Sequence, residues 1–565
     1  MIRNQLADLI KDAIQKLQEE KIFPEFKIPE IKLEQPEEKK YGDYAANAAM
    51  LIAKQVKKNP LEAAENLKSE ILNLKSGYFD KVEIAGPGFI NFFISKEYLQ
   101  KQVAEILKKK EKFGALKIGK EQKINVEFIS ANPTGPLTLG NGRGGFCGDV
   151  LANVLLKAGF KVAREYYIND VGEQIRKLGH SVIGDSEAVY KGDYILALRK
   201  RINPPPLSKK LLIGKDITSP KNSQEKWWGV KGENPEEVGQ KAAEIILKET
   251  IKPAVKKMGI AFDVWFSEKS LRQSGEVKKI FDSLKKKKLT YEKEGALWFS
   301  STKFGDDKDR VLIKEDGETT YFASDIAYLK NKIGRGFNYL IYIWGADHYG
   351  YINRLKAAAE ALGYSKEKVR IIIMQLVRLF KGGKEVRMSK RAGTYVALNE
   401  LIDEVGLDVV RFFFLTRSPG SHLNFDLDLA KEQSERNPVY YIKYAYARIC
   451  SIIKNLKFKN SFKFKNLKLK INTLRLLNHY SELNLIKQLI RFPEVIEDTA
   501  KDEQVQRLPQ YALDLAAVFH QFYRDCRVIS EDKNLTQARL SLILATKQVI
   551  KNTLNLMGIS APEKM

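Results

Sequence analysis

Histidine and cysteine are scarce in this chain. Its 565 residues include only five histidines and three cysteines, and Cys147, Cys450 and Cys526 stand far apart. No two cysteines have the spacing of a metal site, and three cannot form a complete set of disulfides. We therefore expect neither a cysteine-bound metal nor a disulfide framework. This usage is typical of a reducing cytoplasm, where we expect the protein to work.

Long apolar runs are also missing, and we expect no leader sequence. No stretch approaches the roughly 18 apolar residues that a membrane helix requires, so we expect no membrane partner. Asp8, Asp12, Glu19 and Glu20 interrupt the first twenty residues, so we expect neither a signal peptide nor an acid-poor transit peptide.

Positive charge is abundant. Lysine and arginine number 96 against 70 acidic residues, which gives a net charge of +26. A surplus of this size favours a polyanionic partner, with nucleic acid first. A lysine-rich surface without such a partner is the alternative, and composition alone leaves both open. The length suggests about three domains.

Residues 1–113 have the pattern of a small α+β domain. Residues 1–20 have apolar side chains at helical spacing, and a second helix is indicated from about Tyr44 to Lys58. Two strands, Val82–Ile84 and Phe89–Phe93, flank a Gly-Pro-Gly turn. The charge run Lys108–Lys112 is interpreted as a solvated helix end or a linker.

Residues 114–436 alternate between strands and helices. A strand at Ile124–Ile129, a helix near Phe146–Ala158 and a strand near Lys161–Tyr167 form a βαβ unit. Strands near Tyr339–Ile343 and Arg370–Met374 continue the alternation, which predicts a doubly wound, Rossmann-like parallel sheet. An insertion is indicated near 176–250. Its Trp227-Trp228 pair could stack on a base, although packing against the domain is more common.

Residues 437–565 are predicted to be entirely helical. The long apolar faces are Val439–Ile453, Leu513–Cys526 and Leu540–Met557. Between the first two, Lys454–Lys470 interleaves lysines with Phe458, Phe462 and Phe464. This segment could face RNA, or it could be a hairpin with Phe inward and Lys outward, and we weigh the two evenly.

The Gly/Pro-rich stretch Asn132–Gly145 follows the first strand of the sheet, and we expect it to be a loop that holds ATP. Gly140, Gly142 and Gly145 fit G-x-G-x-x-G, and Glu165 stands where a ribose-binding acid would be. The first glycine comes too late after the strand for a dinucleotide fold, so that interpretation is disfavoured. A P-loop near-match at Gly114–Lys120 fails because Glu121 replaces the Ser or Thr that binds Mg²⁺.

A second motif, Gly382–Gly393, is a glycine-hinged loop rich in cations. Such a loop can close over a triphosphate, although alone it would pass for an ordinary basic loop. Together the two motifs resemble those of the class I aminoacyl-tRNA synthetases, and among them the arginyl-tRNA synthetases. Asn132–Asn141 lies where that family has its His-x-Gly-His signature, and Arg387-Met-Ser-Lys390-Arg391 resembles its Lys-Met-Ser-Lys loop.

The resemblance covers nearly the whole chain, through the following further segments: Tyr41–Ala45, Gly86–Asn91, Glu165–Asp170, Trp344–Gly350, Asn437–Arg448 and Ala561–Met565. It implies a tRNA-binding domain at 1–113, a catalytic domain at 114–436 and an anticodon-binding domain at 437–565. The implied reaction joins L-arginine to tRNA(Arg) through an arginyl-adenylate. ATP would be the second substrate, with Mg²⁺ bound to it rather than at a dedicated protein site. We expect a monomer.

The resemblance also implies roles for individual residues. The catalytic residues would be Thr138, Asn141 and Lys390. ATP would be bound by Pro133, Gly135, Gly140, Gly142, Asp347, Met388, Ser389 and Lys390. Arginine would be bound by Glu127, Ser130, Asn132, Tyr321, Asp325 and His348. Without the family, Asp325 would be interpreted as a helix cap and Tyr321 as a core residue.

One departure from the family is plain. Thr138 and Asn141 replace both signature histidines, and they offer neutral rather than charged hydrogen bonds. We expect Lys390, Arg391 and Arg143 to compensate. Glu127, on a buried-type strand, needs a partner, which a bound substrate cation would supply.

Two other functions stay open at this stage. The lost histidines are compatible with a non-catalytic RNA-binding relative, which would bind tRNA without charging it. A nucleotide-dependent dehydrogenase is the other alternative, but the +26 charge and the Lys390 loop would have no role there.

Overall fold

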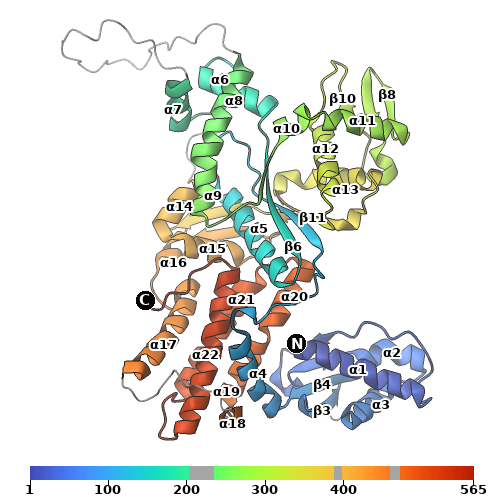
Figure 1. Ribbon diagram of the computed structural model, residues 1–565, viewed down its shortest axis with the longest axis vertical. Coiled ribbons are helices and arrows are strands. Elements are labelled where there is room, and N and C mark those ends of the chain that lie inside the picture. Colours follow the sequence, from blue (N-terminus) through green and yellow to red (C-terminus); the bar gives the residue numbers. More distant parts are fainter. Residues whose placement is uncertain (75, 203–233, 387–396, 459–470) are drawn as a thin grey trace, which may run out of the picture.

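A five-stranded parallel sheet lies near the middle of the molecule (Figure 1). The computed structural model describes residues 1–74, 76–202, 234–386, 397–458 and 471–565. Three predicted groups therefore lie outside the described residues: the loop with Arg387, Met388, Ser389, Lys390 and Arg391, the Trp227-Trp228 pair, and the Phe/Lys segment beyond Phe458.

The N-terminal part is an antiparallel sheet with helices, as predicted. The strands are β1 (Leu33–Glu34), β2 (Tyr44–Ala46), β3 (Phe79–Ala85) and β4 (Phe89–Ile94), in the order β1-β2-β4-β3. The helices are α1 (Ile2–Glu19), α2 (Ala48–Val56), α3 (Pro60–Asn73) and α4 (Lys96–Lys109). The helix predicted from Tyr44 is wrong at its start, because residues 44–46 pair with β4 and only α2 is helical.

The parallel sheet confirms the doubly wound fold. Its order is β12-β11-β5-β6-β7, formed by β5 (Lys123–Glu127), β6 (Lys161–Ile168), β7 (Val264–Ser267), β11 (Tyr339–Gly345) and β12 (Val369–Met374). The chain leaves β5 toward β6 on one side and reaches β11 on the other. The carboxyl ends of β5 and β11 therefore form a topological switch point, where such sheets bind ligands.

Helix α5 (Leu139–Lys157) starts well before the predicted Phe146. The stretch from Leu139 to Gly145 is therefore helix, and the prediction of a loop holds only for residues before it. Tertiary packing overrides the low helix propensity of glycine here. A Cβ on Gly142 would lie 2.6 Å from Leu398 Cδ1, and one on Gly145 would lie 2.6 Å from Met258 Cε. These glycines allow close packing of α5.

Further elements of the central part surround the sheet. They are α6 (Glu173–Ile183), α7 (Asp193–Ile202), α8 (Pro235–Ile246), α9 (Lys252–Lys257), α10 (Glu268–Gln273), α11 (Glu276–Lys286), α12 (Tyr321–Gly334), α13 (Ile352–Ala361), α14 (Leu398–Val405), α15 (Leu407–Leu415) and α16 (Leu427–Lys431). Two small sheets, β10-β9-β8 and β14-β13-β15, contain β8 (Thr290–Lys293), β9 (Ala296–Phe299), β10 (Arg310–Ile313), β13 (Val377–Lys381), β14 (Lys384–Val386) and β15 (Leu423–Asp426).

The C-terminal part is helical, as predicted, and lies beside the N-terminal sheet domain (Figure 1). Its helices are α17 (Pro438–Phe458), α18 (Ile471–Leu474), α19 (Tyr480–Ile490), α20 (Phe492–Asp502), α21 (Arg507–Asp525) and α22 (Lys533–Leu556). Arg3 of α1 pairs with Glu497 at 2.7 Å and Asp498 at 2.8 Å, which docks the N-terminal part on α20.

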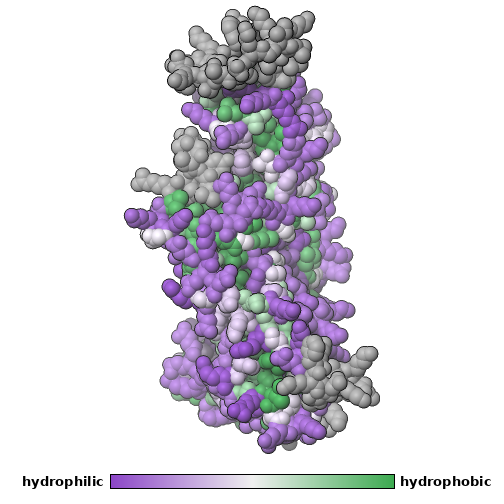
Figure 2. Space-filling view, turned by 90° about the vertical axis from the view of Figure 1, so that its left-hand side faces the viewer, coloured by the Kyte–Doolittle hydropathy of each residue, from purple (hydrophilic) through white to green (hydrophobic). Residues whose placement is uncertain are grey.

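The face shown in Figure 2 is mainly hydrophilic, with smaller apolar patches between the charged side chains. Within the described part of the chain, no helix combines the length and apolar character needed to cross a membrane.

Candidate active site

The carboxyl ends of β5 and β11 open into a cavity of about 650 Å³. Residues from both strands line it, together with the loop from Ile129 to Thr138, the start of α5 and the start of α12. This is the switch point of the sheet, where a ligand can contact residues from several elements at once.

Nine predicted site residues meet in this cavity. They are Glu127, Ser130, Asn132, Thr138, Asn141, Tyr321, Asp325, Asp347 and His348. Four predicted ATP ligands do not line it: Pro133, Gly135 and Gly142 are buried behind its wall, and Gly140 faces solvent. Their contact with ATP stays a prediction, as does that of Met388, Ser389 and Lys390.

Tyr321 and Asp325 lie one turn apart at the start of α12. The hydroxyl of Tyr351 donates to Asp325 Oδ2 at 2.5 Å, and the Tyr321 hydroxyl accepts from the backbone N–H of Glu173 at 2.9 Å. Burial raises the pKa of Asp325 to about 7, and the nearby carboxylates of Glu268 and Glu127 add to the shift. An arriving cation would favour the ionised form of Asp325.

Most other carboxylates of the cavity already have a cation. Glu173 pairs with Lys177 at 2.6 Å, and Glu268 pairs with Arg272 at 2.7 Å. Asp347, exposed at the rim, lies 3.6 Å from His348 Nε2. Within the described ranges, Asp325 is the interior carboxylate of this cavity with no cationic nitrogen within 4.0 Å.

The expectation that a bound substrate cation is the partner of Glu127 is corrected by the structure, in which a lysine of the protein occupies that position. Lys332, a fully buried residue of α12, donates to Glu127 Oε2 at 2.5 Å. The neighbouring strand repeats the arrangement, because Glu165 is held by Arg335, Tyr328 and Asn125. Glu165 is therefore a buried network residue with no role toward a ribose.

The sequence motifs do not identify Lys332 and Arg335 as the partners of Glu127 and Glu165, although the spacing of polar residues along α12 indicates buried partners. Five polar residues occur on α12 and its C-cap at alternating spacings of four and three: Tyr321, Asp325, Tyr328, Lys332 and Arg335. This spacing places them on one helical face, and such a face facing a sheet requires buried partners.

Thr138 and Asn141 cap helix α5. The Thr138 hydroxyl oxygen accepts from the Asn141 N–H at 3.3 Å, and Asn141 Oδ1 accepts from the Thr138 N–H at 2.9 Å. The Thr138 hydroxyl also donates to Asn141 Oδ1 at 2.8 Å. This capping box engages the oxygen of Asn141 and leaves its Nδ2 as the donor for a ligand.

Arg143 does not face the cavity, and the prediction that it compensates for the lost histidines is wrong. Its fully buried guanidinium donates to three backbone oxygens, those of Gln375 at 2.8 Å, Ser421 at 2.8 Å and Ser418 at 2.9 Å. A guanidinium with three carbonyl acceptors is a structural clamp on α5 rather than a phosphate ligand.

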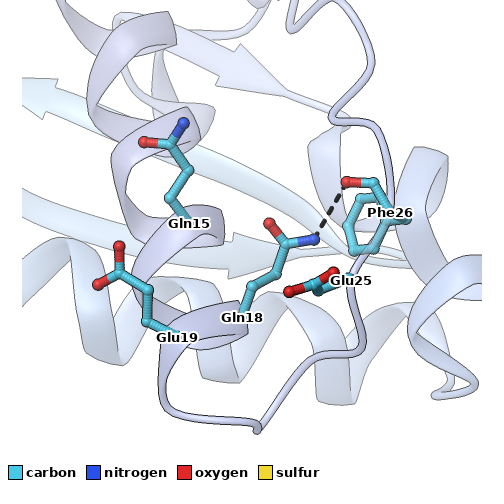
Figure 3. Close-up of a pocket in the computed structure, with 5 residues that line it drawn as sticks. All are labelled: Gln15, Gln18, Glu19, Glu25 and Phe26. Atoms are coloured by element: carbon cyan, nitrogen blue, oxygen red, sulfur yellow. Dashed lines mark hydrogen bonds between the residues drawn. The ribbon is translucent and has the colours of Figure 1, made fainter.

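A second depression, of about 680 Å³, lies in the N-terminal part (Figure 3). Gln15, Gln18, Glu19, Glu25 and Phe26 line it. Gln18 Nε2 donates to the carbonyls of Pro24 and Phe26, each at 3.1 Å, and so ties the following loop to α1. Its described lining residues include two carboxylates and no cationic side chain, which disfavours a phosphate ligand.

The described residues contain no group of three or more His, Cys, Asp or Glu side chains arranged to hold a metal ion.

Comparison with known proteins covers all three parts of the chain. Residues 4–94 match the arginyl tRNA synthetase N terminal domain, 102–411 the catalytic domain of class I (R) tRNA synthetases, and 442–565 the DALR anticodon binding domain.

Two relatives and one solved structure agree with these matches. The arginine–tRNA ligase of Carboxydothermus hydrogenoformans is 46% identical over 95% of this chain and 94% of its own. That of Bacillus licheniformis is 42% identical over the full length of both. The Thermus thermophilus arginyl-tRNA synthetase structure matches with a TM-score of 0.74 at 20% identity, which shows the fold, over 100% of both chains. The chain belongs to the arginyl-tRNA synthetase family of class I aminoacyl-tRNA synthetases.

Proposed function

We propose that the protein is an arginine–tRNA ligase that works in two steps. The carboxylate of L-arginine attacks the α-phosphate of ATP, and pyrophosphate leaves. The terminal ribose hydroxyl of tRNA(Arg) then attacks the arginyl-adenylate and releases AMP. Neither step requires a covalent enzyme intermediate, so positioning and electrostatic stabilisation suffice.

Asp325 is the observation that supports arginine as the substrate. Among the residues that the structure describes, it is the interior carboxylate of the cavity without an ion pair, and the Tyr321 hydroxyl lies one turn away on α12. A guanidinium offers planar donors that suit a carboxylate and hydroxyl oxygens. We assign Asp325 and Tyr321 to the guanidinium, and Asn132 and Ser130 to the α-amino or carboxylate end.

The start of α5 is assigned to the phosphates of ATP. Its first N–H groups carry the positive end of the helix dipole, and Asn141 Nδ2 adds a neutral donor. Thr138 acts by holding this arrangement through the capping box. Lys390 would supply the missing charge, and Mg²⁺ would enter as the counter-ion of ATP. Asp347 and His348 at the rim are assigned to the ribose or the amino acid.

The tRNA would contact all three domains, which we place at 1–113, 114–436 and 437–565. On α17 the rings of Tyr440 and Tyr444 are stacked 6.4 Å apart. The Arg448 guanidinium lies over Tyr444 at 5.4 Å and over Tyr523 of α21 at 4.9 Å. This aromatic ladder of Tyr440, Tyr444, Arg448 and Tyr523 is partly exposed, and it can stack on bases.

The reaction is placed in a reducing compartment, the cytoplasm. Cys147, Cys450 and Cys526 are buried and free, which suits that setting. A monomer stays a prediction, which sedimentation equilibrium tests.

ATP–pyrophosphate exchange tests the first step. Purified protein is assayed with each amino acid, with and without tRNA. The assay includes tRNA because the resemblance to the family implies that arginine is activated only when tRNA is already bound. Exchange should depend on arginine and not on citrulline, its neutral isostere. Absence of arginine-dependent exchange under both conditions would contradict the proposal, and tRNA binding alone would then favour a non-catalytic relative.

A further inference from the structure

A strained turn follows β5 at the edge of the cavity. Ile129 has φ +66° and Ser130 has φ +36°, so two consecutive non-glycine residues adopt left-handed backbone conformations. This region disfavours L-residues, and β-branched residues such as isoleucine most of all. The surrounding contacts must therefore hold the turn in place.

The Ser130 hydroxyl provides the nearest of these contacts. It donates to Glu127 Oε1 at 3.2 Å and accepts from the backbone N–H of Tyr167 at 3.0 Å. The hydroxyl therefore joins the turn to the end of β5 and to the backbone of β6. Its proton is already committed to Glu127.

Glu127 is in turn fixed from behind by Lys332 of α12, at 2.5 Å. The Lys332 ammonium is fully buried and lies over the rings of Tyr328 at 4.5 Å and Tyr342 at 4.1 Å. Tyr342 is the cross-strand neighbour of Glu127 in the β5–β11 register. Two aromatic faces and one carboxylate therefore define a single position for this cation.

We propose that Lys332, Glu127 and Ser130 form a positioning relay that holds the strained turn Ile129–Ser130 and aims the loop with Asn132 into the cavity. Helix α12 also carries Tyr321 and Asp325, so the relay fixes the guanidinium end of the site relative to the loop that leads to Thr138. The inference rests on the proposed function, since it explains how that site is kept in register.

The matched pair Ser130→Ala and Ser130→Gly tests the role of the hydroxyl. Both variants lose the same hydrogen bonds, but only glycine adopts the left-handed conformation freely. If the hydroxyl holds a strained turn, kcat/KM for arginine-dependent exchange is about fivefold or more higher in Ser130→Gly than in Ser130→Ala. If the backbone strain at Ser130 plays no part in shaping the site, glycine is no better than alanine, and the proposal fails.

Lys332→Met tests the buried end of the relay. In the Lys332→Met, Ser130→Ala double variant, the rate of arginine-dependent pyrophosphate exchange should be close to that of the slower single variant, because both changes release the same turn. A double variant whose loss of rate equals the product of the two single losses would indicate two independent defects and would contradict a relay. Lys332→Met with Glu127→Gln removes both charges, and it replaces Lys332→Met if the unpaired Glu127 prevents folding.

Amide hydrogen exchange gives a readout that needs no substrate. The Tyr167 N–H, bound to Ser130, should exchange faster in Lys332→Met by about tenfold or more, while amides within α22 keep the wild-type rate. An unchanged rate of amide hydrogen exchange at Tyr167 would refute the relay even if arginine activation is normal. Wild-type protein without arginine-dependent exchange would instead refute the proposed function and leave this measurement to decide the relay.

Discussion

At the scale of single residues, Asp325 makes arginine binding depend on pH. Its pKa is about 7 in the ligand-free protein, above its ordinary value, and only the ionised form pairs with a guanidinium. Arginine affinity is therefore full above this pKa and falls about tenfold for each pH unit below it. Titration calorimetry across a pH series that brackets the pKa measures the effect.

Asp325→Asn is the control for this dependence. The variant should bind arginine weakly and show a flat pH profile, since the titrating group is gone. A wild-type affinity that is constant through pH 7 would contradict the assignment of the guanidinium to Asp325.

Asn141 and Thr138 have separable roles. Asn141→Asp keeps an acceptor for the cap but removes the Nδ2 donor and adds negative charge, so adenylate formation should slow by about 100-fold or more. Thr138→Ala loses the cap acceptor and should cost about 1 kcal/mol of stability. Pyrophosphate exchange and thermal unfolding are measured for both.

Thr138→Ser keeps the hydroxyl and serves as the control for the cap. If Asn141→Asp retains full activity, the start of α5 does not face the phosphates, and the assignment of this pair has to be abandoned.

At the scale of elements, Arg143 anchors α5 to the segments at Gln375 and Ser418–Ser421. Arg143→Met leaves three partly buried hydrogen bonds to backbone carbonyls unmade, which should lower the free energy of unfolding by about 3 kcal/mol. Thermal unfolding measures the loss of stability, and ATP–pyrophosphate exchange is normalised to the amount of folded protein. Unchanged stability together with lost pyrophosphate exchange would instead indicate that Arg143 binds the phosphates of ATP.

The aromatic ladder on α17 gives a prediction about RNA. Tyr444→Ala should weaken tRNA binding about tenfold, with no change in the salt dependence, because stacking carries no charge. Arg448→Ala should instead flatten the dependence of log K on log salt. Filter binding at several salt concentrations measures both, with Tyr444→Phe as control. If Tyr444→Ala binds tRNA as tightly as the wild type does, the aromatic ladder only packs the helices together and does not contact RNA.

Elements with a clear period were predictable, and those fixed by tertiary contacts were not. Helix α1 and strands β4 and β6 follow their apolar spacing. Helix α5 starts among glycines, and only the close approach of Leu398 and Met258 explains why. Strand β2 is short, and the local pattern predicts a helix there, because a local pattern contains no sign of the pairing with β4.

Within the site, motif residues could be placed from the sequence and their partners could not. Nine predicted residues line one cavity. The Lys332 cation behind Glu127 comes from 205 positions further along the chain, and no local spacing joins them. Arg143 stood next to the motif, yet its charge is used in packing. Its position next to the motif therefore does not show whether its side chain points into the cavity.

At the scale of the whole molecule, the parts are joined by specific contacts. Arg3 connects the first helix to α20, and Tyr44 donates to Glu494 at 2.9 Å. Both contacts join the N-terminal part to α20, so they hold the N-terminal part against the helical C-terminal part.

The most direct test of the account is charging of tRNA by the full-length protein. Unfractionated tRNA is incubated with ATP and each of the amino acids in turn, and the aminoacyl-tRNA formed is measured. The account predicts that arginine alone is attached, and that Asp325→Asn abolishes the attachment. Attachment of another amino acid, or tRNA binding with no charging at all, would contradict it.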